Sequence, residues 1–241
     1  MTTMKFDFDN KTILAISDMH IPFHHKDSFA FLKELKALYK PDLVVSLGDL
    51  GDFHNISFHA ADPDLLSAGD ELEQLQKYSS QLEKLFPSMV IIGSNHGDLI
   101  LRKALANGLP KGFIRPYNDI YGVGPGWVFV DDLTLTCKGE PDIYFVHSVR
   151  KNLLQVAQQR GQRVVCGHNQ ESFNIEYAGN PHSLLWSCIA GCLIDKDSLA
   201  FMYNKLNLNR PIIGTAVIKY GHPQLCPMVL NKHGRWVGEI V

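Results

Sequence analysis

The first half of the chain alternates short apolar runs with longer stretches in which apolar residues recur at helical spacing. The continuous apolar runs at residues 13–17, 42–47 and 89–92 predict buried strands. Leucine and phenylalanine at helical spacing predict helices over residues 28–40 and 65–86, each ended by a proline. Strand, helix and strand in this order form βαβ units, so the strands should be parallel, with right-handed crossovers.

The second half of the chain is richer in strands. Short apolar runs predict strands at residues 127–130, 133–137, 143–146 and 163–166, helices at 99–106 and 153–160, and antiparallel strands within 173–241. Residues 109–126 hold three prolines and several glycines and are expected to cover a site. We therefore predict an α/β fold in one domain spanning residues 1–241. It is a two-sheet β-sandwich built from βαβ units and flanked by helices, with a strand-rich C-terminal half.

The composition is that of an ordinary globular protein, with 45% hydrophobic and 20% charged residues among 241. The net charge of −2 shows no basic excess, which argues against nucleic acid as the main partner but leaves room for a local basic groove. No apolar run approaches the ~20 residues that span a bilayer, so no membrane partner is expected. The five cysteines form no C-x-x-C pair, which favours reduced thiols and a cytoplasmic location. The oligomeric state stays open.

Histidine is unusually frequent, at 11 residues, and it is the commonest metal-ligating side chain. Metal-binding side chains follow five of the predicted strands: Asp18 with His20, Asp49, Asn95, His147 and His168. Because the carboxyl ends of strands in an open α/β sheet form the ligand-binding edge, these groups are expected to converge. Mixed oxygen and nitrogen donors suit manganese, iron or zinc rather than a thiolate-selective metal.

The spacing of these residues indicates a role for each ligand. Asp18 and His20 are two residues apart on an extended chain and are expected to hold a first ion together. The carboxylate of Asp49 has two oxygens and can join this ion to a second one. The second ion would be completed by Asn95, His147 and His168. Two divalent cations ~3.5–4 Å apart lower the pKa of a shared water and stabilise a phosphoryl group under in-line attack.

The leaving oxygen in such a reaction needs a proton or charge stabilisation. His96 follows the predicted ligand Asn95 and is placed to act as general acid. Asp52, three residues after Asp49, is expected to hydrogen-bond to the imidazole of His96 and orient it.

This ordered set of motifs resembles the calcineurin-like metallophosphoesterase superfamily, whose pattern is D-x-H, G-D-x-x-D, G-N-H, a later histidine and G-H-x-H. The corresponding stretches here are residues 18–20, 48–52 and 94–96, His147, and residues 167–170. The resemblance implies a two-sheet α/β sandwich with a dinuclear metal site, bridging by Asp49 and an Asp52–His96 pair. It also implies hydrolysis of phosphate mono- or diesters by a metal-bridged hydroxide, with His96 as general acid.

Two positions depart from the family pattern. Ser94 stands where the family has glycine before Asn-His, which implies a small change of the backbone. Gln170 stands where many members have a second histidine that binds the first ion. The oxygen of a glutamine is a neutral and weaker ligand, so the first ion is expected to be held less tightly.

Three functional hypotheses follow from the sequence. The first is a metal-dependent phosphoesterase with two divalent ions, for which manganese is favoured and iron, zinc and nickel are alternatives. The second is a nuclease acting on DNA or RNA by the same chemistry, against which the near-neutral charge argues mildly. The third is a binding scaffold that lost catalysis, against which the presence of Asn95, His96 and Asp52 argues. The natural substrate stays open.

Further charged and imidazole side chains lie near these motifs or elsewhere on the predicted surface. Solvation or packing is the default role for them, with contact to substrate as the alternative: His24, His25, His54, His59, Arg102, Arg150 and Lys151.

Overall fold

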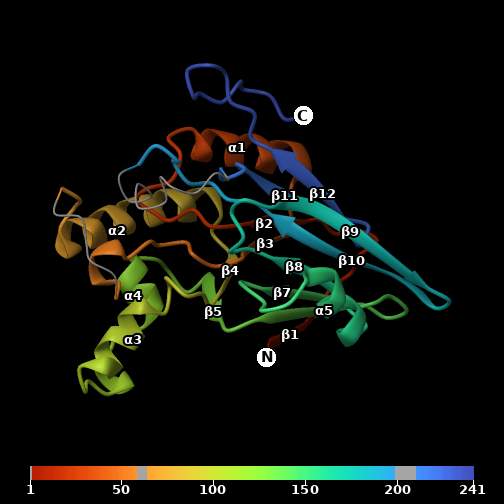
Figure 1. Ribbon diagram of the computed structural model, residues 1–241, viewed down its shortest axis with the longest axis horizontal. Coiled ribbons are helices and arrows are strands. Elements are labelled where there is room, and N and C mark those ends of the chain that lie inside the picture. Colours follow the sequence, from red (N-terminus) through yellow and green to blue (C-terminus); the bar gives the residue numbers. More distant parts are fainter. Residues whose placement is uncertain (1, 59–63, 199–209) are drawn as a thin grey trace.

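The computed structural model describes residues 2–58, 64–198 and 210–241 and consists of two six-stranded sheets with helices outside them (Figure 1). The strands are β1 (Thr2–Lys5), β2 (Ile13–Ile16), β3 (Leu43–Ser46), β4 (Met89–Ile92), β5 (Trp127–Val130), β6 (Leu133–Thr136), β7 (Ile143–Val146), β8 (Arg163–Cys166), β9 (Phe173–Asn180), β10 (Ser183–Ala190), β11 (Gly214–Lys219) and β12 (His222–Pro227). The helices are α1 (Ser28–Tyr39), α2 (Ala68–Leu85), α3 (Leu99–Ala106), α4 (Tyr117–Tyr121) and α5 (Leu153–Arg160), with 3₁₀ turns η1 (His54–Ile56) and η2 (Lys111–Phe113). Over these ranges, every helix is too short or too polar to cross a membrane. The two-sheet α/β sandwich predicted from the sequence is confirmed.

One sheet has the strand order β12-β11-β2-β3-β4-β5, and its strands β2 to β5 are parallel. Alternate residues of these strands face opposite cores. Ile13 and Val45 point into the space between the sheets, whereas Leu14 and Val44 belong to the core that α1 and α2 cover. Because both faces are covered, each strand reads as a continuous apolar run, which is why the sequence revealed it.

The other sheet has the order β1-β6-β7-β8-β10-β9. Its inward residues, such as Phe145 and Trp186, share the buried core with Ile13 and Val45. Its outward residues, such as Val164, pack against α5 through Ala157. The sandwich therefore has four layers, with α5 on one outer face and α1 and α2 on the other (Figure 1).

The predicted boundaries of β4, β5, β7, β8, α3 and α5 match the structure. Helix α2 begins later than expected, at Ala68, because Ser67 ends the preceding loop and accepts a hydrogen bond from the Asp70 amide at 3.2 Å. Strand β1 was not predicted, since its residues are mostly exposed and its parallel pairing with β6 joins positions about 130 residues apart. The expected run of strands to residue 241 is wrong beyond Pro227, where the described chain forms only the isolated bridge between Leu230 and Trp236.

Asp27 stands at the N-terminus of α1, as expected of a capping residue, but its side chain makes no capping bond. The carboxylate instead accepts hydrogen bonds from Arg235 Nη2 at 2.5 Å and Nε at 2.7 Å, and from the Trp236 amide at 3.0 Å. The Trp236 ring packs edge-on against Phe31, with ring centroids 5.6 Å apart. Asp27 thus connects the start of α1 to the segment that follows β12.

The Asp27–Arg235 pair makes stability depend on pH. The hydrogen bonds from Arg235 lower the pKa of Asp27 to about 2, below the ordinary 3.8, so the stabilisation is complete above pH ~4 and is lost as the pH falls toward 2. We expect Asp27→Asn to lower the urea midpoint of unfolding at pH 7, and the gap from wild type to narrow as the pH is lowered from 4 toward 2. The exposed carboxylate of Asp9 provides the control variant Asp9→Asn. An equal loss in Asp9→Asn, or a gap that does not change with pH, would contradict this account.

Candidate metal centre

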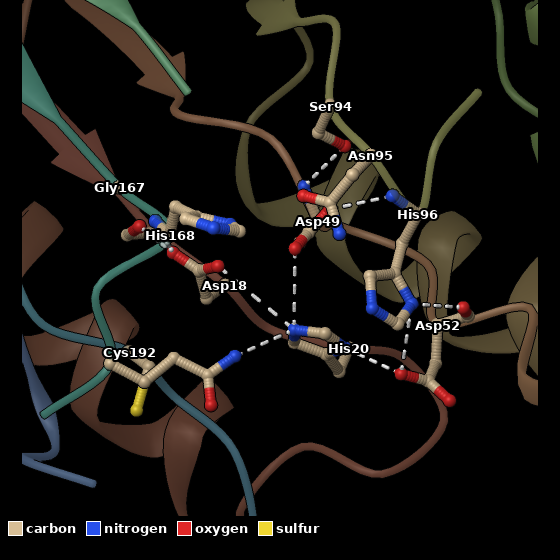
Figure 2. A network of polar contacts seen from close by, with 12 residues as sticks. Asp18, His20, Asp49, Asp52, Ser94, Asn95, His96, Gly167, His168 and Cys192 are labelled. Carbon is tan, nitrogen blue, oxygen red and sulfur yellow. Dashed lines mark hydrogen bonds and ion pairs between the residues drawn. The ribbon is translucent and has the colours of Figure 1, made fainter. Parts of the chain in front are cut away.

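The strand-end residues singled out in the sequence come together at the carboxyl ends of β2, β3, β4, β7 and β8. One group contains Asp18, His20 and Asp49, and a second contains Asp49, His147 and His168, with the ligand atoms of each group within 4.8 Å of one another. The two groups share Asp49. Figure 2 shows the side chains of Asp18, His20, Asp49 and His168 around a common centre. The two groups supply donors for the predicted pair of sites joined by one carboxylate, and the binding of metal there stays a prediction.

The backbone at this centre takes conformations that L-residues rarely adopt. φ is 44° at Asp18, 48° at His20, 44° at Asp49 and 66° at His168. Aspartate and histidine tolerate this left-handed region better than most residues, but it still costs free energy that the surroundings must offset. Hydrogen bonds between the loops do so, including His20 N to Asp49 O at 2.9 Å and His168 N to Asp18 Oδ2 at 2.9 Å.

Hydrogen bonds to Nδ1 fix the orientation of two imidazoles. His147 Nδ1 lies 2.9 Å from the carbonyl oxygen of Leu47, which can only accept, so Nδ1 donates and the ring presents Nε2 to the centre. His20 Nδ1 lies 2.5 Å from Asp52 Oδ1 and leaves its own Nε2 toward the centre. The two Nε2 atoms lie 3.6 Å and 3.3 Å from Asp49 Oδ2 for His20 and His147 respectively.

Two amide side chains complete the cluster. Asn95 Oδ1 lies 2.6 Å from His147 Nε2. Gln170 Nε2 lies 2.9 Å from His20 Nε2, so the residue that departs from the family pattern reaches the group of the first ion. A rotation of its amide by a half turn would present the oxygen at the same point.

The electrostatics of the centre are dominated by buried carboxylates. Burial, with the neighbouring charge of Asp49, raises the pKa of Asp18. Burial also acts to raise the pKa of Asp49, but the hydrogen bond from His147 and the charge of His20 hold it far below its usual range. Burial lowers the pKa of His20, yet the hydrogen bond to Asp52 and the nearby carboxylates outweigh it and raise the pKa to about 9.

These residues fit a pair of divalent cations. Asp18 Oδ1 is buried and accepts no hydrogen bond within the described chain, and an unneutralised buried carboxylate is costly. The donors are oxygen and nitrogen, the set that manganese, iron or zinc accepts. The Cys166 and Cys192 thiols donate to main-chain carbonyl oxygens instead, to that of His147 at 3.1 Å and to that of Ile212 at 3.6 Å.

The role expected for the Asp52 carboxylate differs from what the structure shows. The carboxylate lies closer to His20 Nδ1, at 2.5 Å, than to His96 Nδ1, at 3.4 Å. His96 Nδ1 instead donates to the main-chain carbonyl of Asp52 at 2.6 Å (Figure 2). The backbone of the turn therefore orients His96, and the carboxylate serves His20 first. The second ring nitrogen of His96 faces Asp49 and His20 (Figure 2).

Ser94, the other departure from the family pattern, joins two loops. Its hydroxyl oxygen accepts hydrogen bonds from the amides of Asp49 at 2.8 Å and of Gly97 at 3.1 Å. Ser94 also lies close to Gly48, where φ is +99°. A Cβ added to this glycine would lie 2.6 Å from Ser94 Cβ. The serine thus holds the loop of Asn95 and His96 against the turn of Asp49, a role the sequence did not reveal.

The sequence also missed the contacts that hold the ligands from behind. A Cβ on Gly167 would lie 2.5 Å from Ser17 Oγ and 2.9 Å from Asp18 Oδ2, so the glycine of the last motif admits Asp18. The Glu71 carboxylate on α2 accepts hydrogen bonds from the amides of His54 and Asn55, at 2.9 and 3.2 Å, just after Asp52. Gly167 belongs to the last sequence motif and could be recognised from it, whereas no pattern in the sequence pointed to Glu71.

The remaining candidates lie around this centre. Burial lowers the pKa of His24 to about 4, and its ring packs against Phe29 and Tyr78, so it is a neutral packing residue. His25 Nε2 lies 3.0 Å from the carbonyl oxygen of Gly234. His54 Nδ1 is 3.9 Å from Asp52 Oδ2. Three further candidates are exposed: Arg102, Arg150 and Lys151. His59 lies outside the described residues.

Comparisons with known proteins identify the family of this chain and a similar fold. The family model described as calcineurin-like phosphoesterase matches residues 11–198. The crystal structure of Vps29 from Chaetomium thermophilum is 14% identical, covers 98% of this chain and 95% of its own, and has a TM-score of 0.50. Vacuolar protein sorting 29 from Cryptosporidium parvum (15% identical, 91% and 96% covered, TM-score 0.44) and TT1561 of Thermus thermophilus (10% identical, 90% and 98% covered, TM-score 0.46) are also similar. A search of curated protein sequences found no match. At these identities, the Chaetomium structure speaks to the fold alone.

The hydroxyl of Ser94 should contribute measurably to stability. Ser94→Ala leaves the buried amide of Asp49 and the partly buried amide of Gly97 without this acceptor, so we expect the free energy of unfolding to fall by about 1–3 kcal/mol. Ser79→Ala is the matched control, since Ser79 is also buried and its hydroxyl has no hydrogen-bond partner among the described residues. Urea unfolding of both variants measures the difference. Equal free energies of unfolding for the two variants would mean that the hydrogen bonds of Ser94 do not contribute to stability.

Proposed function

This chain belongs to the calcineurin-like phosphoesterase family, whose model matches residues 11–198, and we propose that it is a metal-dependent hydrolase of phosphate mono- or diesters. The observation that carries the proposal is the pair of ligand groups that share Asp49, with His96 beside them. A scaffold that only binds partners would not need a histidine facing the shared carboxylate.

The ligand sets follow from the two groups. Asp18, His20 and Asp49 would hold the first ion, with Gln170 alongside, and Asp49 would extend to a second ion. The second would be completed by Asn95, His147 and His168. When bound, two such ions neutralise the phosphate oxygens and lower the pKa of a water between them. We propose manganese as the ion, with iron, zinc and nickel as alternatives.

In this proposal His96 supplies the proton, and Asp52 holds His96 and His20 in position. The attacking water releases one proton to solvent, its oxygen forms the new bond to phosphorus as the bond to the leaving oxygen breaks, and the leaving oxygen takes a proton from His96 Nε2. His96 can present this atom because its Nδ1 is held by the Asp52 carbonyl at 2.6 Å. The Asp52 carboxylate also keeps His20 in the tautomer that leaves Nε2 free.

We propose a reducing compartment, the cytoplasm, as the location. The cysteines of this chain are all free, and four of the five are buried. Reduced, buried thiols are the usual state of cysteine in cytoplasmic proteins.

Two substitutions separate metal binding from proton transfer. We expect Asp49→Asn to lose bound manganese and hydrolysis together, because it removes the shared charge. We expect His96→Asn to keep the metal and to lower the turnover of an alkyl phosphodiester by about 10²–10⁴-fold. The measurements are elemental analysis and steady-state kinetics across monoester and diester substrates with several metals.

The control for these variants is His233→Asn, which changes an exposed turn histidine and should leave both readouts intact. Near-normal turnover in Asp49→Asn would refute the mechanism. No hydrolysis of any ester by the metal-loaded wild type would refute the function.

Gln170 is expected to limit the affinity for the first ion. Replacing it with histidine supplies the imidazole found in many family members, so Gln170→His should tighten manganese binding by about tenfold. Gln155→His on the exposed face of α5 is the control. Isothermal titration of the metal-free proteins with manganese measures both constants. Unchanged affinity in Gln170→His would show that the side chain does not reach the ion.

A further inference from the structure

One surface beside the metal centre has a charge unlike that of the whole chain. Residues 99–118 contain four cationic residues and no acidic residue, whereas the full chain has a net charge of −2. The four are Arg102, Lys103, Lys111 and Arg115. Within the described ranges, none of them pairs with a carboxylate at 4.0 Å or less. We call residues 99–117 the basic segment; it comprises α3, η2 and the first residue of α4.

The same surface exposes large apolar side chains. Phe113 is 74% exposed and Leu105 is 54% exposed. Phe58 is 52% exposed. Lys103 Nζ lies 4.3 Å from the centroid of its ring, and the Arg102 guanidinium lies 5.3 Å from it. Figure 1 shows α3 and the turn after it projecting from the body of the sheets, at the lower left. Cations and exposed rings are therefore interleaved on one projecting surface.

A cavity of about 350 Å³ connects this surface to the metal centre. Lys111 and Arg115 line it together with Asp49 and Ser94, and two further acidic residues, Asp98 and Asp131, also belong to its lining. Its wall includes Tyr117 and Phe129, which stack with centroids 5.2 Å apart and an interplanar angle of 24°. A ligand that lies on the basic segment thus has a path to the shared carboxylate.

A smaller, mainly apolar cavity of about 300 Å³ lies on the other side of the same chain segment. Phe113, Ile114 and Arg115 line it together with Phe53 and residues of α2 and α3. Ile114 and Arg115 line both cavities, so the basic segment borders two hollows, of which the smaller one is mainly apolar.

We propose that the basic segment binds a single-stranded nucleic acid and leads one of its phosphodiesters to the metal centre. Arg102, Lys111 and Arg115 would pair with phosphates, and Phe113 would stack with a base. Proteins that bind single strands combine these two elements, a row of cations along the backbone and aromatic faces for the bases. The hydrolytic part of this inference rests on the proposed function, whereas the binding part does not.

Cations suit both a nucleic acid and an anionic membrane, and the packing of α3 favours the nucleic acid as the occupant. A membrane-binding helix needs a free apolar face. Helix α3 has eight residues, and Leu99 and Ala104 are already buried against the protein. A nucleic acid also carries a phosphodiester at every residue, which suits a surface that adjoins a phosphoesterase centre.

The binding test uses the full chain without metal. Fluorescence anisotropy with a labelled oligothymidylate of about 15 nucleotides gives the Kd at several salt concentrations. The triple variant Arg102→Gln, Lys111→Gln and Arg115→Gln should bind at least ~10-fold more weakly, and its salt slope should fall by about 2, since each neutralised phosphate contributes ~0.7 on single strands. Phe113→Ala should weaken binding by about tenfold, because a base loses its stacking partner.

Matched controls carry the same changes on other surfaces. Lys5→Gln, Lys11→Gln and Lys138→Gln alter the net charge equally at sites away from the centre, and Tyr177→Ala removes an exposed ring from β9. Both controls should bind the oligonucleotide as the wild type does. Failure of the wild type to bind, equal losses in the controls, or a preference for vesicles containing phosphatidylserine over the oligonucleotide would overturn the inference.

The hydrolytic arm separates this inference from the proposed function. With manganese, the rate of oligonucleotide degradation divided by the rate of cleavage of a small aryl phosphodiester should be at least ~10-fold lower in the triple variant than in the wild type. If the wild type cleaves no ester at all, the proposed function fails while the binding result still stands. If the wild type cleaves the aryl diester and ignores the oligonucleotide, the inference fails and the function stands.

Discussion

The carboxylate of Asp49 imposes the constraint that the rest of the centre satisfies. It is 2% exposed, belongs to both ligand groups and sits on a left-handed residue with φ of 44°. A charge buried this deeply is tolerated only with close compensation. The loop after β4 supplies it through the His96 amide, which donates to Asp49 Oδ1 at 3.1 Å. The loops after β2 and β7 supply it through Nε2 of His20 and of His147, which lie 3.6 Å and 3.3 Å from Asp49 Oδ2. Two sheets have to meet at this edge because no single strand end carries enough donors.

Much of the fold and of the centre could be predicted because the informative signals are local. Strands buried on both faces read as apolar runs, and polar residues directly after such runs identify the binding edge. What escaped prediction depends on contacts across long stretches of chain. The Leu47 carbonyl fixes His147, 100 residues away, and a carbonyl has no sequence signature. The Asp52 carboxylate lies closer to His20 than to His96. At this turn the main-chain carbonyl of Asp52, and not its side chain, is nearest to His96 Nδ1.

Net charge was a poor guide to the surface of this molecule. The value of −2 averages acidic and basic regions, and it argued mildly against a polyanionic substrate. Residues 99–118 contain four cations and no acidic residue, although Asp98 and Asp119 flank them. This stretch follows the loop of Asn95 and His96 in the chain. Electrostatic recognition acts over about a Debye length, ~8–10 Å, so the local balance of charge decides which ligands approach.

The strict alternation of side chains in β2 and β3 restricts where the length of this chain can change. Ile13 and Leu14 belong to different cores, as do Val45 and Val44. One inserted residue would turn every later side chain of the strand to the wrong face, and would rotate Asp18 or Asp49 away from its partners. The four-residue strands β2 and β3 are therefore closed to insertion and deletion. Divergence among relatives should collect in connections such as the hairpin between β9 and β10, where a change of length leaves both cores and the ligands in register.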